Sequence, residues 1–245
     1  MHQIISCKDD SLKGIEMKNA NLREANFRGA DLQGTNLFGA NLSYADLMDA
    51  DLRGSDLREA NLSHANFKGT KVNLETQINS KWRLVWEIIN YPSIYKDLSK
   101  KDLANADLSS VYLNSVILTD ANLSNSDLWQ GNLKNTQLNN SNFSNAILWH
   151  TNLSNSSIIG VNFTQAILWS ANLSGANLSN SNFSGANLSG ANLSNTNLTG
   201  VNFSAANLCS VNFDGANLDE VNFDGAYFDD INKHLLKGII PEDKL

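Results

Sequence analysis

The side chains with the richest catalytic and metal-binding chemistry are few in this 245-residue chain, and they are widely separated. The four histidines lack the close spacing of zinc ligands: His2, His64, His150 and His234. Two cysteines, Cys7 and Cys209, are too few for a disulfide scaffold and lack a nucleophile's setting. No glycine-rich phosphate loop follows a strand and opens a helix. We therefore expect no catalytic residue, no metal and no cofactor, and we interpret the chain as not an enzyme.

The tryptophans are the strongest candidates for a binding surface. Trp129, Trp149 and Trp169 are spaced by twenty residues, and Ile147 and Ile167 precede the last two in matching segments, "AILWHTNL" and "AILWSANL". Exposed apolar patches often mark interaction sites, and tryptophan is enriched at binding hot spots. The sequence leaves several arrangements open. The indoles form a partner surface, stack on one another, lie beneath another segment, or stack against a planar ligand such as a sugar ring or base.

A period of five residues sets the positions of these side chains. From Leu12 to Val72, and again from Leu98 to Phe228, every fifth residue is apolar, in 13 and 27 consecutive repeats. We call this position the centre. A small residue usually lies two positions before it, and Asn or Asp lies one position before it. An α-helix cannot keep a five-residue period on one face, whereas a short extended segment followed by a turn can.

The turn is visible two residues after the centre. Of the 15 glycines, 13 occupy this position, and asparagine is common there. Both residue types tolerate the left-handed backbone conformation that many turns require. A chain that turns in the same direction every five residues predicts a polygonal coil.

The A(N/D)LXX pattern resembles the pentapeptide-repeat family over residues 11–72 and 98–230. The resemblance implies an all-β fold, a right-handed quadrilateral β-helix with four repeats in each coil, and about ten coils. The sequence supplies a test of the coil length, because distinctive residues recur every twenty positions. Five phenylalanine centres are expected to form one internal column: Phe143, Phe163, Phe183, Phe203 and Phe223.

The repeat is interrupted over residues 73–97. Ile78, Trp82, Val85, Trp86 and Ile89 have helical spacing, which predicts a helix over about 80–90 that is capped by Ser80 and ended by Pro92. "KWRLVWEIIN" resembles an insertion found in cyanobacterial members of the family. Trp82 and Trp86 are expected to pack against the solenoid, and a helix that docks a partner is the alternative.

We expect a single structural domain with five segments. They are an N-terminal tail (1–10), coils (11–72), the helical insertion (73–97), further coils (98–230) and a C-terminal cap (231–245). The acids of residues 214–230 are interpreted mainly as protection of an open solenoid end, where unpaired edges invite association.

The net charge and the distribution of charged residues limit the classes of function that the chain can have. The net charge is −7, and residues 135–213 contain no charged side chain. There is no basic surface for nucleic acid and no apolar run that would span a membrane. We therefore expect a cytoplasmic scaffold or interaction module with a protein partner, and leave open a monomer, an end-to-end dimer or a side-by-side dimer. The alternative is a DNA mimic that modulates gyrase or another DNA-binding protein, although such a mimic needs rows of carboxylates.

Overall fold

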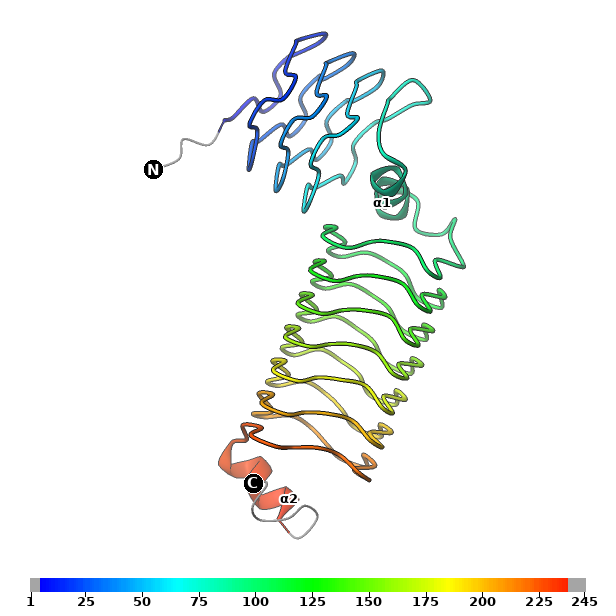
Figure 1. Cartoon of the computed structure of the whole chain (residues 1–245), viewed down its shortest axis with the longest axis vertical. Coiled ribbons are helices and arrows are strands. Elements are labelled where there is room, and N and C mark those ends of the chain that lie inside the picture. Colours follow the sequence, from blue (N-terminus) through cyan, green and yellow to red (C-terminus); the bar gives the residue numbers. More distant parts are fainter. Residues whose placement is uncertain (1–4, 238–245) are drawn as a thin grey trace. The chain divides into compact units, whose positions relative to one another are not determined.

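The computed structural model describes residues 5–237, apart from the side chains of Ile231 and Leu235, as stacked four-sided coils with two short helices (Figure 1). Each side of a coil is a short extended segment. The residue before each centre forms a parallel bridge with the residue twenty positions later, as in Asn142↔Asn162 and Asn162↔Asn182. These bridges confirm the twenty-residue coil, and the fold is a right-handed β-helix.

Each repeat satisfies its backbone N–H groups in the same way, and the repeat around Phe163 illustrates the pattern. The N–H of Phe163 donates to Asn182 O in the next coil, and the N–H of Asn162 donates to Ser141 O in the preceding coil. The Asn162 side-chain oxygen accepts from the N–H of Thr164 at 3.0 Å. The asparagine of the repeat therefore stabilises the turn that follows its own strand, as in other Asx turns.

The turn position behaves as the sequence predicts. All residues two positions after a centre, from Asp9 to Gly69 and from Lys100 to Gly225, have positive φ. The N–H of the next residue donates back to the centre, as Ala166 does to Phe163 O. Positive φ at the third residue is the requirement of a type II turn, and glycine meets it without steric cost.

The interior consists of stacked centres flanked by small residues. The predicted phenylalanine column is confirmed, with successive ring centroids 4.6–5.8 Å apart from Phe143 to Phe223. Phe143, Phe163, Phe183 and Phe203 are completely buried. Buried serines and threonines beside the centres donate to nearby carbonyls, as Ser141 Oγ does to Leu138 O at 2.6 Å. Among the described residues, no buried side-chain nitrogen or oxygen lacks a hydrogen-bond partner, so the core accommodates these hydroxyls.

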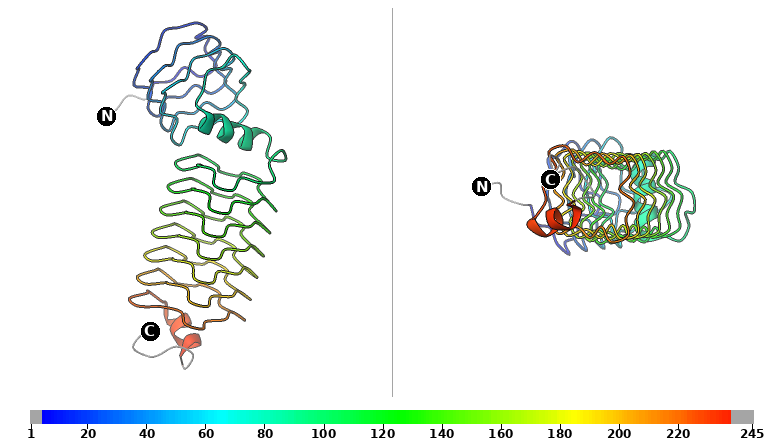
Figure 2. Two further views of the ribbon diagram at one scale, coloured as in Figure 1. Left: turned by 45° about the vertical axis from the view of Figure 1, so that its right-hand side comes forward. Right: turned by 90° about the horizontal axis from the view of Figure 1, so that it is seen from below.

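The coils belong to two compact units rather than to the single domain expected from the sequence. Unit 1 comprises Met1–Pro92 and Asn105–Asp107, and unit 2 comprises Ser93–Ala104 and Leu108–Leu245. The physical reason lies in the ladder. The last bridge before the insertion is Asp56↔Gln77, and regular twenty-residue bridging resumes with Asp97↔Ile117. Figure 2 shows the parallel stacking within each unit.

Unit 1 begins and ends differently from the predicted boundaries. Residues 5–10 belong to the first coil rather than to a tail, since Ser6 bridges Asn26 and Cys7 takes the place of a centre. Residues 1–4 lie outside the described part. Residues 73–77 complete a coil, because Gln77 bridges Asp56 after a step of 21 residues instead of twenty. The insertion proper is therefore shorter than 73–97.

Helix α1 (Ser80–Asn90) closes unit 1. Its N-cap is Asn79, whose side chain accepts from the N–H of Lys81, so the expectation that Ser80 caps the helix is wrong. Trp82, Val85 and Ile88 are buried. Ile88 is not among the residues whose helical spacing predicted the packed face. A helix that lies across the open end of a coil buries a broader stripe than spacing alone indicates.

Side chains of α1 replace part of the missing next coil. Asn90 Oδ1 accepts from Gly69 N at 2.8 Å, and Asn90 Nδ2 donates to Phe67 O at 3.1 Å. Trp86 Nε1 donates to Thr70 O at 2.7 Å. These groups would otherwise be edge donors and acceptors of the last coil, so α1 is an end cap.

Unit 2 carries the longer ladder, which passes through seven coils on the side of Asp97, Ile117 and Gln137. Helix α2 (Asp230–Leu236) follows its last strand and is capped by Asp229, whose side chain accepts from Asn232 N. The predicted helical turn of the C-terminal cap is therefore present. Residues 238–245 of that segment lie outside the described part of the chain.

Candidate functional site

The three tryptophans of unit 2 occupy one position of the repeat on three successive coils. Each lies one residue after a buried leucine centre, and the strands are joined by the bridges Asp127↔Ile147 and Ile147↔Ile167. Because this position points outward on every side of a coil, the indoles lie next to one another. We call the surface formed by Trp129, Trp149, Trp169, Ile147 and Ile167 the indole strip.

Neighbouring indoles of the strip contact one another with tilted rings and are also exposed to solvent. The ring centroids of Trp129 and Trp149 are 6.4 Å apart, and those of Trp149 and Trp169 are 4.7 Å apart, with interplanar angles of 44° and 38°. Trp149 and Trp169 expose 37% and 41% of their surface, and Ile167 exposes 42%. Ile147 is half-buried. Of the arrangements left open by the sequence, the structure shows contact between the indoles themselves, with the rings tilted and each indole partly exposed.

His150 is a member of this cluster that the sequence did not single out. Its ring centroid lies 5.3 Å from that of Trp149 and 5.5 Å from that of Trp169. The side chain reaches both indoles because His150 occupies the left-handed turn position, with φ of 55°. Its place beside the matched tryptophans was the signal that could have identified it. The imidazole adds a polar edge to an otherwise apolar strip.

The electrostatic surroundings of the strip change along the ladder. One coil before Ile147, Asp127 accepts from the N–H of Trp129 at 2.8 Å. One coil after Ile167 the equivalent residue is Asn187, which accepts from the N–H of Ser189 at 3.1 Å. The strip thus begins beside a carboxylate and continues into an uncharged region. Such an arrangement can bind an apolar partner surface without burying an unpaired charge.

The two remaining candidates, Trp82 and Trp86, do not belong to an exposed surface. Trp82 is buried in α1, and Trp86 is half-buried with its indole N–H bonded to Thr70 O. Both side chains hold the helix on the end of unit 1. Their inclusion as interaction residues is therefore corrected, because the aromatic helix face is used for capping within the unit.

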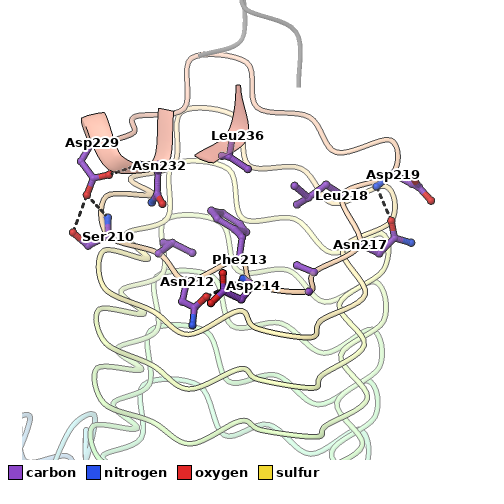
Figure 3. Close-up of a pocket in the computed structure, with 13 residues that line it drawn as sticks. Ser210, Asn212, Phe213, Asp214, Asn217, Leu218, Asp219, Asp229, Asn232 and Leu236 are labelled. Carbon is purple, nitrogen blue, oxygen red and sulfur yellow. Dashed lines mark hydrogen bonds between the residues drawn. The ribbon is translucent and has the colours of Figure 1, made fainter. Parts of the chain in front are cut away.

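A second candidate site is an open pocket at the end of unit 2, which we call the end pocket. It has a volume of about 690 Å³ and lies between residues 210–219 and α2 (Figure 3). Phe213 and Leu218 form apolar walls and are half-buried, although the corresponding centres one coil earlier, Leu193 and Leu198, are completely buried. Among the residues that the structure describes, the pocket is thus the part of the last coil's interior on which no further coil is stacked.

Helix α2 covers one side of this end. Asp229 accepts from the Ser210 N–H at 2.7 Å and from the Ser210 hydroxyl at 2.8 Å, and Asn232 Nδ2 donates to Leu208 O at 3.0 Å (Figure 3). Hydrogen bonds from the Asn232 N–H and from Ser210 lower the pKa of Asp229. The sequence indicated an acidic solenoid end, but its pattern could not show that α2 covers the side of the coil at Leu208 and Ser210.

We also searched the described residues for metal-binding groups, a reactive thiol and a membrane-spanning helix. Between residues 5 and 237, no three His, Cys, Asp or Glu side chains are grouped closely enough to hold a metal ion. Burial raises the pKa of the Cys209 thiol, which makes the thiolate less accessible at neutral pH. None of the helices in this part of the chain is long and apolar enough to cross a membrane.

Comparisons with known proteins agree with the repeat architecture. The family model described as "Pentapeptide repeats" matches in eight copies, over segments that together extend from 15 to 73 and from 97 to 232. A search of curated proteins found no significant match.

Several solved structures are similar in sequence. HetL, a pentapeptide repeat protein involved in heterocyst differentiation regulation from Nostoc sp. strain PCC 7120, is 26% identical, with 94% of this chain and 92% of that chain covered and a TM-score of 0.23. QnrB1, a plasmid-mediated fluoroquinolone resistance protein, is 19% identical, with 97% and 98% covered and a TM-score of 0.42. Rfr23 from Cyanothece 51142 is 35% identical, with 48% and 63% covered and a TM-score of 0.26.

With TM-scores below 0.5, these structures say nothing about how the present chain acts. The family model does identify the family, since it covers most of the sequence and its repeats coincide with the bridged coils. The chain belongs to the pentapeptide-repeat family.

Proposed function

We propose that this chain is a non-catalytic interaction module that binds another protein through the indole strip. The observation that carries the proposal is the contact between the tilted rings of Trp149 and Trp169 on adjacent coils while each keeps more than a third of its surface exposed. At the same position on the following coil the chain has Ser189. Three consecutive indoles at a position that accepts serine favour a role beyond filling the repeat.

The geometry also favours tight contact. The indoles are held by each other and by His150, so little side-chain freedom remains to be lost when a partner covers them. Ile167 lies beside them and extends the apolar area. Aromatic anchors that are already ordered and surrounded by neutral side chains are typical of binding hot spots.

The charge pattern argues against a DNA mimic. The strand column that contains the strip runs from Asp127 through Ile147 and Ile167 to Asn187. Residues 135–213 have no charged side chain, so carboxylates do not form continuous rows along unit 2. A surface that imitates a duplex needs a strong negative field along its whole length.

The proposal can be tested with full-length tagged protein in a native lysate. Replacement of Trp149 and Trp169 by serine, the residue native to position 189, should remove bound partners and leave the fold intact. Tyr112→Ser is the matched control, because Tyr112 is 65% exposed on another side of unit 2. We expect the control to capture the same partners as the wild type. Equal capture by the double variant would rule out the strip as the partner surface.

A further inference from the structure

The first coil of unit 1 is also uncovered among the described residues. Cys7, Leu12 and Met17 occupy centre positions and are half-buried, whereas the centres of the second coil, Phe27 and Leu32, are completely or almost completely buried. Ile5 and Ile15 are each 43% exposed. Within residues 5–237, this end of unit 1 and the end pocket of unit 2 are therefore both apolar interiors on which no further coil is stacked.

The backbone edges of these two ends are complementary. In unit 2, Leu193 N and Leu198 N donate to the next coil, and Ala191 O and Thr196 O accept from it. One coil later, no regular coil follows within residues 5–237 to pair with the equivalent Phe213 and Leu218 N–H groups and the Val211 and Ala216 carbonyls, because α2 takes its place in the sequence. The end pocket thus offers donors and acceptors in the pattern that a following coil would satisfy.

The first coil of unit 1 offers the opposite edge. In the second coil, Asp31 N donates to Asp10 O at 2.9 Å and Asn36 N donates to Ile15 O at 3.0 Å. The equivalent N–H groups of Ser11 and Glu16 have no backbone acceptor in the part of the chain that the structure describes. These donors match the free carbonyls of the end pocket, because both belong to the same parallel ladder.

The charged side chains of the two end coils occupy equivalent positions of the repeat. The residue after each centre is basic on all four sides of the first coil: Lys8, Lys13, Lys18 and Arg23. The same position is acidic on all four sides of the last coil: Asp214, Asp219, Asp224 and Asp229. In a continued ladder, residues at this position lie one above another at a spacing of about 4.8 Å. On each side that docks, a base would therefore meet an acid, although Lys8 and Arg23 also pair with Asp9 and Glu24 in their own coil.

We propose that the end pocket binds the first coil of a second copy of this chain, giving head-to-tail assembly. The contact uses the two sides of the last coil around Phe213 and Leu218, because α2 covers the neighbouring side at Leu208 and Ser210. All four sides of the first coil carry a base at the same position, so the charge match does not depend on which two sides dock.

A two-fold tail-to-tail contact is disfavoured by the same features. It would bring six acids of residues 214–230 against six acids of the partner, with no basic residue in either segment. It would also place free donors of the same edge type opposite one another. A head-to-tail contact is heterologous, so it can extend to more than two copies.

Sedimentation velocity of the full-length protein over a range of protein and salt concentrations tests the proposal. We expect concentration-dependent association at low salt that weakens as salt rises, since the paired charges are exposed. Two variants separate the ends: Lys13→Glu with Lys18→Glu, and Asp214→Lys with Asp219→Lys. Each variant alone should associate at least about tenfold more weakly than the wild type, because each meets like charges at its contact.

A mixture of the two variants is the decisive sample. The acidic first coil of one variant then meets the basic last coil of the other, and the remaining native ends are also opposite in charge, so association should return. Arg28→Glu with Lys68→Glu is the matched control for the Lys13→Glu, Lys18→Glu variant, because it makes the same change in net charge on the second and fourth coils. We expect this control to behave as the wild type. Circular dichroism and thermal melting establish that all variants are folded.

Three outcomes would overturn the proposal. The first is a wild type that stays monomeric at low salt and high concentration. The second is a mixture that associates no better than its components. The third is association that appears only when the chain is ended after Lys237, which would mean that residues 238–245 exclude a second copy. The Trp149→Ser, Trp169→Ser variant should assemble as the wild type does, so this test is independent of the indole strip.

Discussion

At the outward position of the repeat, the residue type decides whether a side chain only supports the turn or also forms a specialised surface. Ser174, Ser179 and Ser189 follow their centres and donate backbone N–H groups to the preceding asparagine, which is all that the turn requires. Trp149 and Trp169 occupy the same position but add large apolar surfaces that the core does not need. A specialised surface can therefore be changed without altering the interior on which the fold depends.

The Asp51–Arg53 pair gives unit 1 a defined pH dependence. Arg53 Nη2 lies 2.6 Å from Asp51 Oδ2, and the hydrogen bonds from this guanidinium lower the pKa of Asp51 below its ordinary value of 3.8. A carboxyl with a lowered folded-state pKa contributes stability that is complete above the unfolded-state pKa and is lost as the pH falls through the folded-state pKa. The free energy of unfolding of unit 1 should therefore decrease below about pH 4.

Asp51→Asn removes this contribution. We expect the variant to be less stable than the wild type near neutral pH, and the difference should shrink in strong acid, where Asp51 is protonated in both states. Urea denaturation near neutral pH and in strong acid measures this difference in the free energy of unfolding. Asp46→Asn is the control, since the residue two positions later is Met48 instead of arginine. A difference between wild type and Asp51→Asn that is the same at both pH values would contradict the assignment.

At the scale of elements, α1 acts as a substitute for a coil. Asn90 contacts both a donor and an acceptor of the last coil of unit 1, namely Gly69 N and Phe67 O. Asn90→Ala leaves both groups without these bonds, and we expect the free energy of unfolding of unit 1 to fall by about 1–2 kcal/mol. Chemical denaturation measures this loss. Leu74→Ala, at a fully exposed side chain, should change stability little, and an equally small effect of Asn90→Ala would show that α1 caps the coil by apolar packing alone.

Much of the coil structure could be predicted from the sequence because the same five-residue pattern occurs in many consecutive repeats. The column from Phe143 to Phe223 and the glycine and asparagine turns follow from five-residue and twenty-residue spacing. The ends could not be predicted, because an end is a single event without repetition. Cys7 was not recognised as a centre, and Gln77 lies one residue beyond the regular step.

The indole strip, too, could be predicted from the sequence only in part. The spacing predicted that Trp129, Trp149 and Trp169 share one column, and it left their exposure open. Exposure depends on which neighbouring segment covers an outward face, and no periodicity encodes that. Trp82 could not be assigned for a related reason, since an amphipathic helix can bury its aromatic face within its own unit or against a partner.

At the scale of the whole molecule, stability should be distributed along the ladder instead of concentrated in one core. Phe163 is completely buried between Phe143 and Phe183, with ring centroids 5.2 Å and 4.6 Å away. Phe163→Ala should cost unit 2 about 3–5 kcal/mol, because it leaves a cavity in the phenylalanine column. Hydrogen exchange followed by mass spectrometry should show the largest loss of protection in the coils next to position 163.

Unit 1 is the internal control in that experiment. It is a separate compact unit with its own cap, so its exchange should remain close to that of the wild type. Loss of protection spread evenly over residues 5–92 as well as over unit 2 would instead mean that the chain unfolds as one cooperative domain.

The central claim is that the indole strip binds a partner protein, and site-specific photo-crosslinking in cells tests it most directly. A benzophenone amino acid is placed at position 149, and at position 179 as the control, because Ser179 has the same place in its repeat on another side of unit 2. The account predicts a discrete adduct with a partner protein at 149 that is absent at 179 and weakened by Trp169→Ser. An adduct pattern at 149 that does not differ from that at 179 would contradict the claim.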